Sequence, residues 1–154
     1  MDTIKTMLAT CRNWKDAKQV AAVAAYEDSH TDARAAEFCR CLSRQLGQEC
    51  ELSKQMWLLN ELRIPQLRAI AAGEAAQADL VIISVHHAPS LPTEVIHWID
   101  EWVAHKRRRP RVLLALFDPA YEGDSGSMQT YLAQVAKKGA MEFLVHSEEL
   151  MEDS

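Results

Sequence analysis

Acidic residues and histidines follow several apolar runs of this sequence, at the points where the runs end. Carboxylates and imidazoles are side chains that bind divalent metals and transfer protons. The carboxyl ends of parallel strands meet at one edge of a sheet, where ligands bind in α/β folds. If the runs are parallel strands, their polar ends form one candidate pocket, here called the strand-end cluster, which consists of Glu27, Asp28, His86, His87 and Asp118.

Two interpretations compete for the strand-end cluster. Polar residues end strands in any case, because loops contact solvent and Asp favours turns. The sharper interpretation is a divalent metal site, in which Asp28, His86 and Asp118 would supply the mixed carboxylate and imidazole ligands that suit zinc, manganese or iron. No metal-binding spacing motif joins these residues, and adjacent histidines on a strand point to opposite faces. We therefore expect no resident metal, with this three-residue site as the alternative.

Phosphate binding and nucleophilic catalysis lack the motifs they need. Residues 26–31 contain no glycine that would let backbone amides approach a phosphate, and their carboxylates would repel one. No Walker lysine motif, dinucleotide glycine fingerprint or Gly-x-Ser-x-Gly elbow occurs in the chain. The four cysteines have no finger spacing and are interpreted as reduced thiols. Enzymatic activity stays open, and a non-enzymatic role is favoured.

The overall composition is that of one globular domain. The chain has 154 residues, of which 48% are hydrophobic and 25% are charged. Its formal net charge of -5 gives no general attraction for nucleic acid or an anionic membrane. No apolar stretch approaches the roughly 20 residues of a membrane span, and the first residues lack the build of a secretory signal. We expect a cytoplasmic protein without nucleic-acid or membrane partners.

Apolar runs alternate with amphipathic segments along most of the chain. This alternation predicts a three-layer α/β/α sandwich with a parallel sheet and right-handed crossovers. The first and third runs are the most uniformly apolar and must be central, whereas the second is polar on one face, so the predicted strand order is 2-1-3-4-5. Five strands are expected at residues 20–26, 50–59, 79–85, 111–117 and 142–146, and four helices at residues 29–47, 65–78, 91–108 and 126–139.

Local signals set the expected helix ends and the domain boundaries. Ser29 is expected as the N-cap of the first of these helices, and Gly47 as its C-terminal cap. In the second helix, Ile70 is expected on the inner face. The expected organisation is a helical lead-in at residues 1–18, a single domain at residues 19–147 and an acidic tail at residues 148–154.

The helix expected after residue 91 carries aromatic side chains on more than one face. Trp102 belongs to its core stripe, while Trp98 lies about 100° from Ile99 on a helical wheel. The ring of Trp98 is therefore expected to be only partly covered by its own domain. Leu91, Trp98 and Trp102 form the candidate interface, for a homodimer or another protein partner. The alternative is that the lead-in around Trp14 folds over Trp98 and buries it.

Several segments resemble the receiver domains of bacterial response regulators, namely residues 23–28, the helix with Arg34 and Leu42, residues 78–84 and residues 138–140.

In receivers, an acidic pair after the first strand binds magnesium, and this resemblance implies that role for Glu27 and Asp28. The position of the phospho-accepting aspartate holds Val85 or His86 instead, and the lysine position after the last strand holds His146. The resemblance is therefore to a degenerate receiver that works without phosphorylation, and it implies a signalling role.

Residues 78–84, 91–95 and 98–100 are also similar to the third strand, flavin-facing loop and following helix of flavodoxin-like proteins and flavin-dependent quinone reductases. This resemblance implies the flavodoxin-like fold, with Trp57 in the place of a flavin-stacking aromatic residue. The Ser-, Thr- and Gly-rich phosphate loop of those proteins is replaced here by the acidic residues 26–31. We expect no flavin, with flavin mononucleotide as the alternative cofactor.

These observations favour a non-enzymatic signalling or protein-interaction module with a degenerate receiver-like fold. One alternative is a small enzyme, or a ligand or metal sensor, that uses the strand-end cluster. The other alternative is a flavodoxin-like flavin-binding protein.

Overall fold

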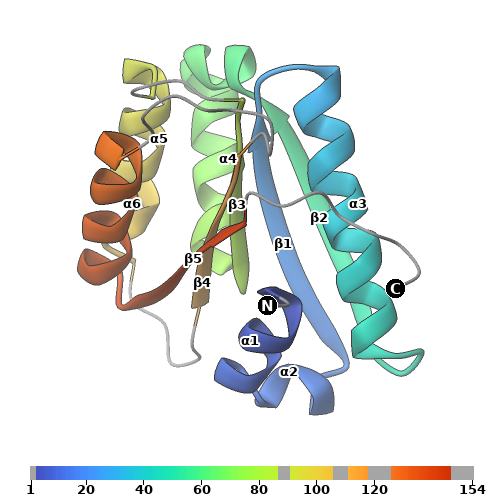
Figure 1. Ribbon diagram of the computed structural model, residues 1–154. Coiled ribbons are helices and arrows are strands. Elements are labelled where there is room, and N and C mark those ends of the chain that lie inside the picture. Colours follow the sequence, from blue (N-terminus) through green and yellow to red (C-terminus); the bar gives the residue numbers. More distant parts are fainter. Residues whose placement is uncertain (1–2, 87–90, 106–110, 118–125, 147–154) are drawn as a thin grey trace.

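The structure, a computed structural model, describes residues 3–86, 91–105, 111–117 and 126–146. Within these residues the chain forms one five-stranded sheet in which every neighbouring pair of strands is parallel. Figure 1 shows helices on both faces of this sheet. The strands are β1 (Gln19–Tyr26), β2 (Glu51–Leu58), β3 (Leu80–Ser84), β4 (Arg111–Leu116) and β5 (Met141–His146).

The strand order is β2-β1-β3-β4-β5, which confirms the predicted order. All residues of β3 are buried, as expected of a central strand that helices cover on both faces. β2 lies at one edge of the sheet, and none of its residues is fully buried. Because β1 and β3 pair with Tyr26 opposite Ser84, the residues that follow these two strands start from the same edge of the sheet.

Two apolar clusters hold the helices against the two faces of the sheet. The side chains of β1 alternate between them, because Val20, Ala22 and Ala24 join one cluster and Val23 and Ala25 join the other. The first cluster packs under α1 (Thr3–Thr10), α2 (Asn13–Asp16) and α3 (Ser29–Leu46). The second packs under the 3-10 helix η1 (Leu59–Arg63), α4 (Pro65–Gln77), α5 (Thr93–Val103) and α6 (Gly126–Lys138).

The N-terminal helices α1 and α2 belong to the core on the α3 side of the sheet. Met7 and Trp14 are completely buried there. α1 also contacts β5, and Thr3 Oγ1 lies 2.7 Å from Nδ1 of His146. α3 packs mainly on β1, β2 and β3 on this face, and α1 adds to the cover at β5, where Phe38 of α3 also meets the ring of His146. In the part of the chain that the structure describes, no helix is both long enough and apolar enough to cross a membrane.

α3 begins with Asp28 as its N-cap. The Asp28 carboxylate accepts hydrogen bonds from the amides of His30 and Thr31, and the Thr31 side chain bonds back to the Asp28 amide, which completes a capping box. The prediction of Ser29 as the cap is wrong, because the extended backbone and the bonded carboxylate of an N-cap are those of Asp28, and Ser29 is already the first helical residue. Gly47 ends α3 as predicted, with a φ of 91° that favours glycine.

α4 packs on the sheet through small residues. Ala71, Ala72 and Ala75 are buried against the sheet, whereas the side chain of Ile70 is 54% exposed. The prediction that Ile70 faces inward is therefore wrong. The helix approaches the sheet through alanines, and Ile70 lies one residue to the side of that narrow face.

α5 buries its aromatic side chains. Trp98 and Trp102 are both 0% exposed and meet edge to face with their ring centroids 5.7 Å apart, and Leu91 is also buried. The predicted partial exposure of Trp98 in a candidate interface of Leu91, Trp98 and Trp102 is therefore wrong. Trp14 does not cover Trp98 either, since it packs on the opposite face of the sheet. α5 lies between α4 and α6, and these two helices cover sides of α5 that a helical wheel of α5 alone assigns to solvent.

Two charged side chains are buried at the ends from which β3 and β4 start. Asp79 and Arg111 are each only 2% exposed. Oδ2 of Asp79 accepts a hydrogen bond of 2.9 Å from the amide of Ala21 in β1. Nη2 of Arg111 donates to the carbonyl oxygens of His105 and Gly139, at 3.1 and 3.4 Å. The Asp79 contact joins the start of β3 to β1, and the Arg111 contacts join the start of β4 to the residues that follow α5 and α6.

Candidate functional site

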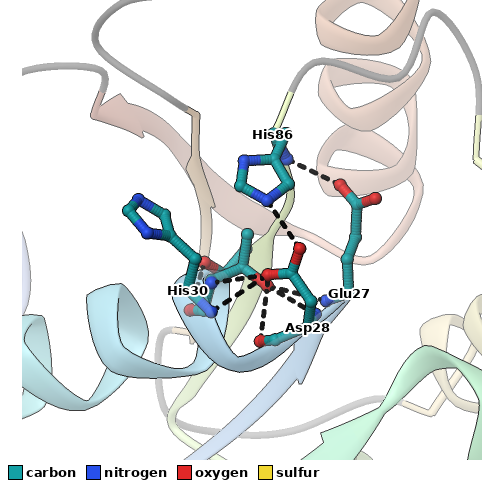
Figure 2. A network of polar contacts seen from close by, with 6 residues as sticks. Glu27, Asp28, His30 and His86 are labelled. Atoms are coloured by element: carbon teal, nitrogen blue, oxygen red, sulfur yellow. Dashed lines mark hydrogen bonds and ion pairs between the residues drawn. The ribbon is translucent and has the colours of Figure 1, made fainter.

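The edge where β1 and β3 end brings three residues of the strand-end cluster together, as Figure 2 shows. The backbone amide of His86 donates to Oε1 of Glu27 at 2.6 Å. The Nε2 atom of the same histidine lies 2.7 Å from Oδ2 of Asp28. Glu27 and Asp28 therefore hold the chain and the ring of His86 just after β3. The other two members of the cluster, His87 and Asp118, lie outside the described residues.

The loop between β1 and α3 satisfies its own backbone amides. Oδ1 of Asp28 accepts from the amides of His30 and Thr31, at 3.1 and 3.0 Å. Oγ1 of Thr31 accepts from the amides of Glu27 and Asp28, at 2.8 and 3.0 Å. The hydroxyl of Ser84, which is buried in β3, donates to the carbonyl oxygen of Thr31 at 2.8 Å and fixes this loop to the sheet. The amides of Glu27, Asp28, His30 and Thr31 are thus already bonded to side chains of the loop itself.

The Asp28 carboxylate stays ionised to unusually acidic pH. The hydrogen bond from the Thr31 backbone amide, followed by the contact with His86, lowers the pKa of Asp28 from 3.8 to about 2. Both partners stabilise the charged form of the carboxylate. The side chain is 49% exposed, so this negative charge faces solvent at the strand-end edge.

A second imidazole lies beside this pair. The ring of His30, in the first turn of α3, stacks on the ring of His86 with centroids 5.4 Å apart and an angle of 27° between the planes. Figure 2 shows both rings on the same side of the loop. The site is therefore a carboxylate and imidazole cluster. The sequence interpretation missed His30 and Thr31 as members, although Thr31 follows Asp28 at the spacing of a capping box.

Among the described residues, no three or more His, Cys, Asp or Glu side chains are arranged so that they could hold one metal ion. Asp28 and His86 are the two members of the expected metal site that the structure places, and Asp118 lies outside the described residues. Trp57, which the resemblance placed as a flavin-stacking residue, packs against the core beneath α4. Its indole N–H donates to Oε1 of Glu74 at 2.6 Å, so the orientation of this ring is set by α4.

Nucleophilic side chains are poorly activated in the described part of the chain. Burial raises the pKa of the Cys11 and Cys39 thiols to about 11, and it also raises the pKa values of Cys41 and Cys50. All four cysteines are free and stay protonated near neutral pH. None of these thiols is bonded to the Asp28–His86 pair.

No protein-family model matches the chain, and no curated protein matches its sequence. Solved structures do match it. A flavodoxin of Streptococcus pneumoniae TIGR4 is 16% identical, with a TM-score of 0.54 and 88% of each chain covered. A short-chain flavodoxin associated with a non-canonical PDU bacterial microcompartment is 12% identical, with a TM-score of 0.55 and 89% of each chain covered. The chain has the flavodoxin-like fold. At these identities the likeness establishes the fold alone.

The flavodoxin-like fold raises the question whether the loop after β1 fits the phosphate group of a flavin mononucleotide. The amides that would bind this phosphate donate instead to Asp28 and Thr31. Two carboxylates, those of Glu27 and Asp28, lie at the same edge and would repel a phosphate. The residues of this loop, in the arrangement that the structure shows, do not fit that group.

Proposed function

We propose that this protein is a non-enzymatic signalling or protein-interaction module that uses the flavodoxin-like fold as its framework. The observation that carries the proposal is the closed network at the strand-end edge. Glu27 and Asp28 bind His86 and the amides of α3, so the groups that a ligand would need are bonded to one another. With the described part of this edge, between the ends of β1 and β3, occupied by its own side chains, the outer surface of the fold is what a protein partner would contact.

The state of the described nucleophiles supports a non-enzymatic role. The thiols have raised pKa values and are protonated near neutral pH, so they are weak nucleophiles. The Ser84 hydroxyl is buried, and it donates to a backbone carbonyl rather than to a base. Neither group is placed for covalent catalysis with the Asp28–His86 pair.

The partner in this proposal is a protein, either a second copy of the chain or a different one. The net charge of -5 disfavours nucleic acid and anionic membranes. The most exposed large apolar side chains among the described residues are Ile64 and Ile70, at 47% and 54%, and both lie in the segment that runs from η1 into α4. Exposed apolar side chains are common anchors of protein interfaces, so this segment is where we place the contact.

The test compares the natural chain with the double variant Ile64→Ser and Ile70→Ser. Serine suits the N-cap position that Ile64 holds in α4, so the variant is expected to fold. We expect self-association, measured by sedimentation, or capture of one defined partner to be lost in the double variant. The control is Ala69→Ser, an exposed change in the same helix, which should leave binding unchanged. A natural chain that stays monomeric and captures no partner would contradict the proposal.

The geometry of the Asp28–His86 pair favours a ligand sensor or small enzyme as a second candidate function. A carboxylate 2.7 Å from an imidazole nitrogen fixes the orientation of the ring, as the carboxylate partner of a general-base histidine does. Flavin or metal binding belongs to this second class. Visible absorbance and metal analysis of protein purified without chelator separate the two candidates, because a yellow or metal-loaded protein would favour the second.

A further inference from the structure

The amino end of α3 is already occupied by an anion, which is the carboxylate of Asp28. Helix N-termini bind anions because their free amides and the helix dipole both favour negative charge. Here Oδ1 of Asp28 takes the hydrogen bonds of two such amides, from His30 and Thr31. Its second oxygen, Oδ2, contacts Nε2 of His86. The carboxylate thus has the partners that a bound phosphate would have at this position.

We propose that Asp28 is an internal substitute for the phosphate of a ligand. It excludes phosphate-bearing molecules, flavin mononucleotide included, by occupying the amides rather than by charge alone. The loop after β1 therefore does not fit a phosphate, despite the flavodoxin-like fold, mainly because of the Asp28 side chain. This inference concerns the loop itself and does not depend on whether the protein binds a partner.

Occupancy and charge make different predictions for variants of the two carboxylates. Asp28→Asn removes the charge but keeps a side-chain oxygen that can accept from the same amides. Asp28→Ser shortens the side chain and removes one of its two oxygens, and because a Ser N-cap accepts from only one of the amides of His30 and Thr31, the other amide is freed. Glu27→Gln removes the neighbouring charge and leaves the Asp28 cap in place.

If occupancy is the cause, only the shortened side chain admits a phosphate. Asp28→Ser should bind inorganic phosphate on the order of tenfold or more tightly than the natural chain, because the phosphate gains a charge-assisted hydrogen bond from the freed amide. Asp28→Asn and Glu27→Gln should bind it no better than the natural chain does. Asp32→Asn is the matched control, since it removes an acidic residue from the first turn of the same helix without touching the cap.

The experiment is a titration with inorganic phosphate, followed by the backbone amide NMR signals of residues 29–31 and repeated with flavin mononucleotide. We expect phosphate-dependent shifts of these signals in Asp28→Ser and none in the natural chain. Asp28→Gly serves as a second variant in case Asp28→Ser does not fold, because glycine is also accepted at an N-cap.

Three outcomes would overturn the inference. The first is phosphate binding at these amides by the natural chain. The second is an equal gain in Asp28→Asn or Glu27→Gln, which would show that charge is the cause. The third is the absence of binding in every folded variant that lacks the Asp28 carboxylate, which would show that the backbone of the loop excludes the anion.

Discussion

The two ends of the sheet use similar residue types in opposite ways. At the starting end, Asp79 and Arg111 are each 2% exposed, and both form hydrogen bonds with backbone groups. At the other end, the side chain of Asp28 is 49% exposed and that of His86 26% exposed, and they bond to each other beside a loop. The first end therefore buries its charged side chains in the core, whereas the second holds titratable side chains that solvent can reach.

This difference shows that residue type and position on a strand are a weak guide to role. A buried charge is expensive to leave without its partner, so the starting end should tolerate few changes. An exposed pair contributes little to stability, so the carboxyl end can vary without loss of the fold. A functional role for the carboxyl end requires that its variants change binding more than they change stability. The following predictions test this contrast, from the largest expected effect to the smallest.

The largest loss of stability is expected for Trp102→Ala. Trp102 is fully buried, and the guanidinium carbon of Arg111 lies 5.6 Å from its ring centroid. Removal of the ring leaves a cavity beneath the starting end of the sheet and should lower the free energy of unfolding by about 4 kcal/mol. Urea unfolding measures the change. Ile70→Ala is the control, because its side chain is exposed. A comparable loss of stability there would show that Ile70 packs in the core and does not face solvent.

A smaller loss is expected for Asp79→Ala. The partly buried amide of Ala21 would lose its acceptor, which should lower the free energy of unfolding by about 2 kcal/mol. Asp79→Asn keeps an oxygen acceptor and should recover part of this loss in the same urea experiment. If Asp79→Ala proved as stable as the natural chain, the buried charge at the starting end would not contribute to the stability of the fold.

Acid should remove the contribution of Asp28 in a low pH window. The pKa of Asp28 is lowered from 3.8 to about 2 in the folded chain, so the carboxylate stabilises the fold fully above pH 3.8. That contribution is lost as the pH falls toward about 2. Asp28→Asn should therefore show a flatter dependence of the urea midpoint on pH across this window. Identical pH profiles for the two proteins would contradict the hydrogen bonds assigned to Asp28.

The smallest effect on stability is expected for His86→Gln. The ring of His86 is partly exposed and pairs with a carboxylate that faces solvent. The midpoint of urea unfolding should stay unchanged within error. Loss of the stacked contact should shift the imidazole proton signals of His30, whose ring lies 5.4 Å away, and NMR measures this. A large fall in stability would place His86 with the structural residues instead.

Much of the fold was predictable because its signals are local. The run from Leu80 to Ser84 is apolar at every position, and only a strand covered on both faces buries all of them. The mixed polarity of β2 likewise predicted its place at an edge. Gly47 ended α3 where the sequence placed it, since few other residues adopt a φ of 91° without strain.

The misplaced residues depend on neighbours that lie far away in the sequence. A helical wheel of α5 gives the direction of the Trp98 side chain but not the positions of the neighbouring helices. The ring is buried because α4 and α6 pack beside α5. Ile70 was assigned to the inner face because it is apolar, whereas the narrow contact of α4 uses alanines. Nothing in the local sequence indicates that Arg111 is buried, because the carbonyl oxygens that accept its hydrogen bonds belong to the segments after α5 and α6.

The sequence by itself determined the order of the elements and the parallel sheet, because the alternation of apolar runs with amphipathic segments allows few other arrangements. It also determined that Glu27, Asp28 and His86 follow strands. Only the tertiary structure decided what these residues do there. The register of β1 against β3 places His86 Nε2 2.7 Å from Oδ2 of Asp28, 58 residues earlier in the chain, and a hydrogen bond between such distant residues depends on packing rather than on local pattern.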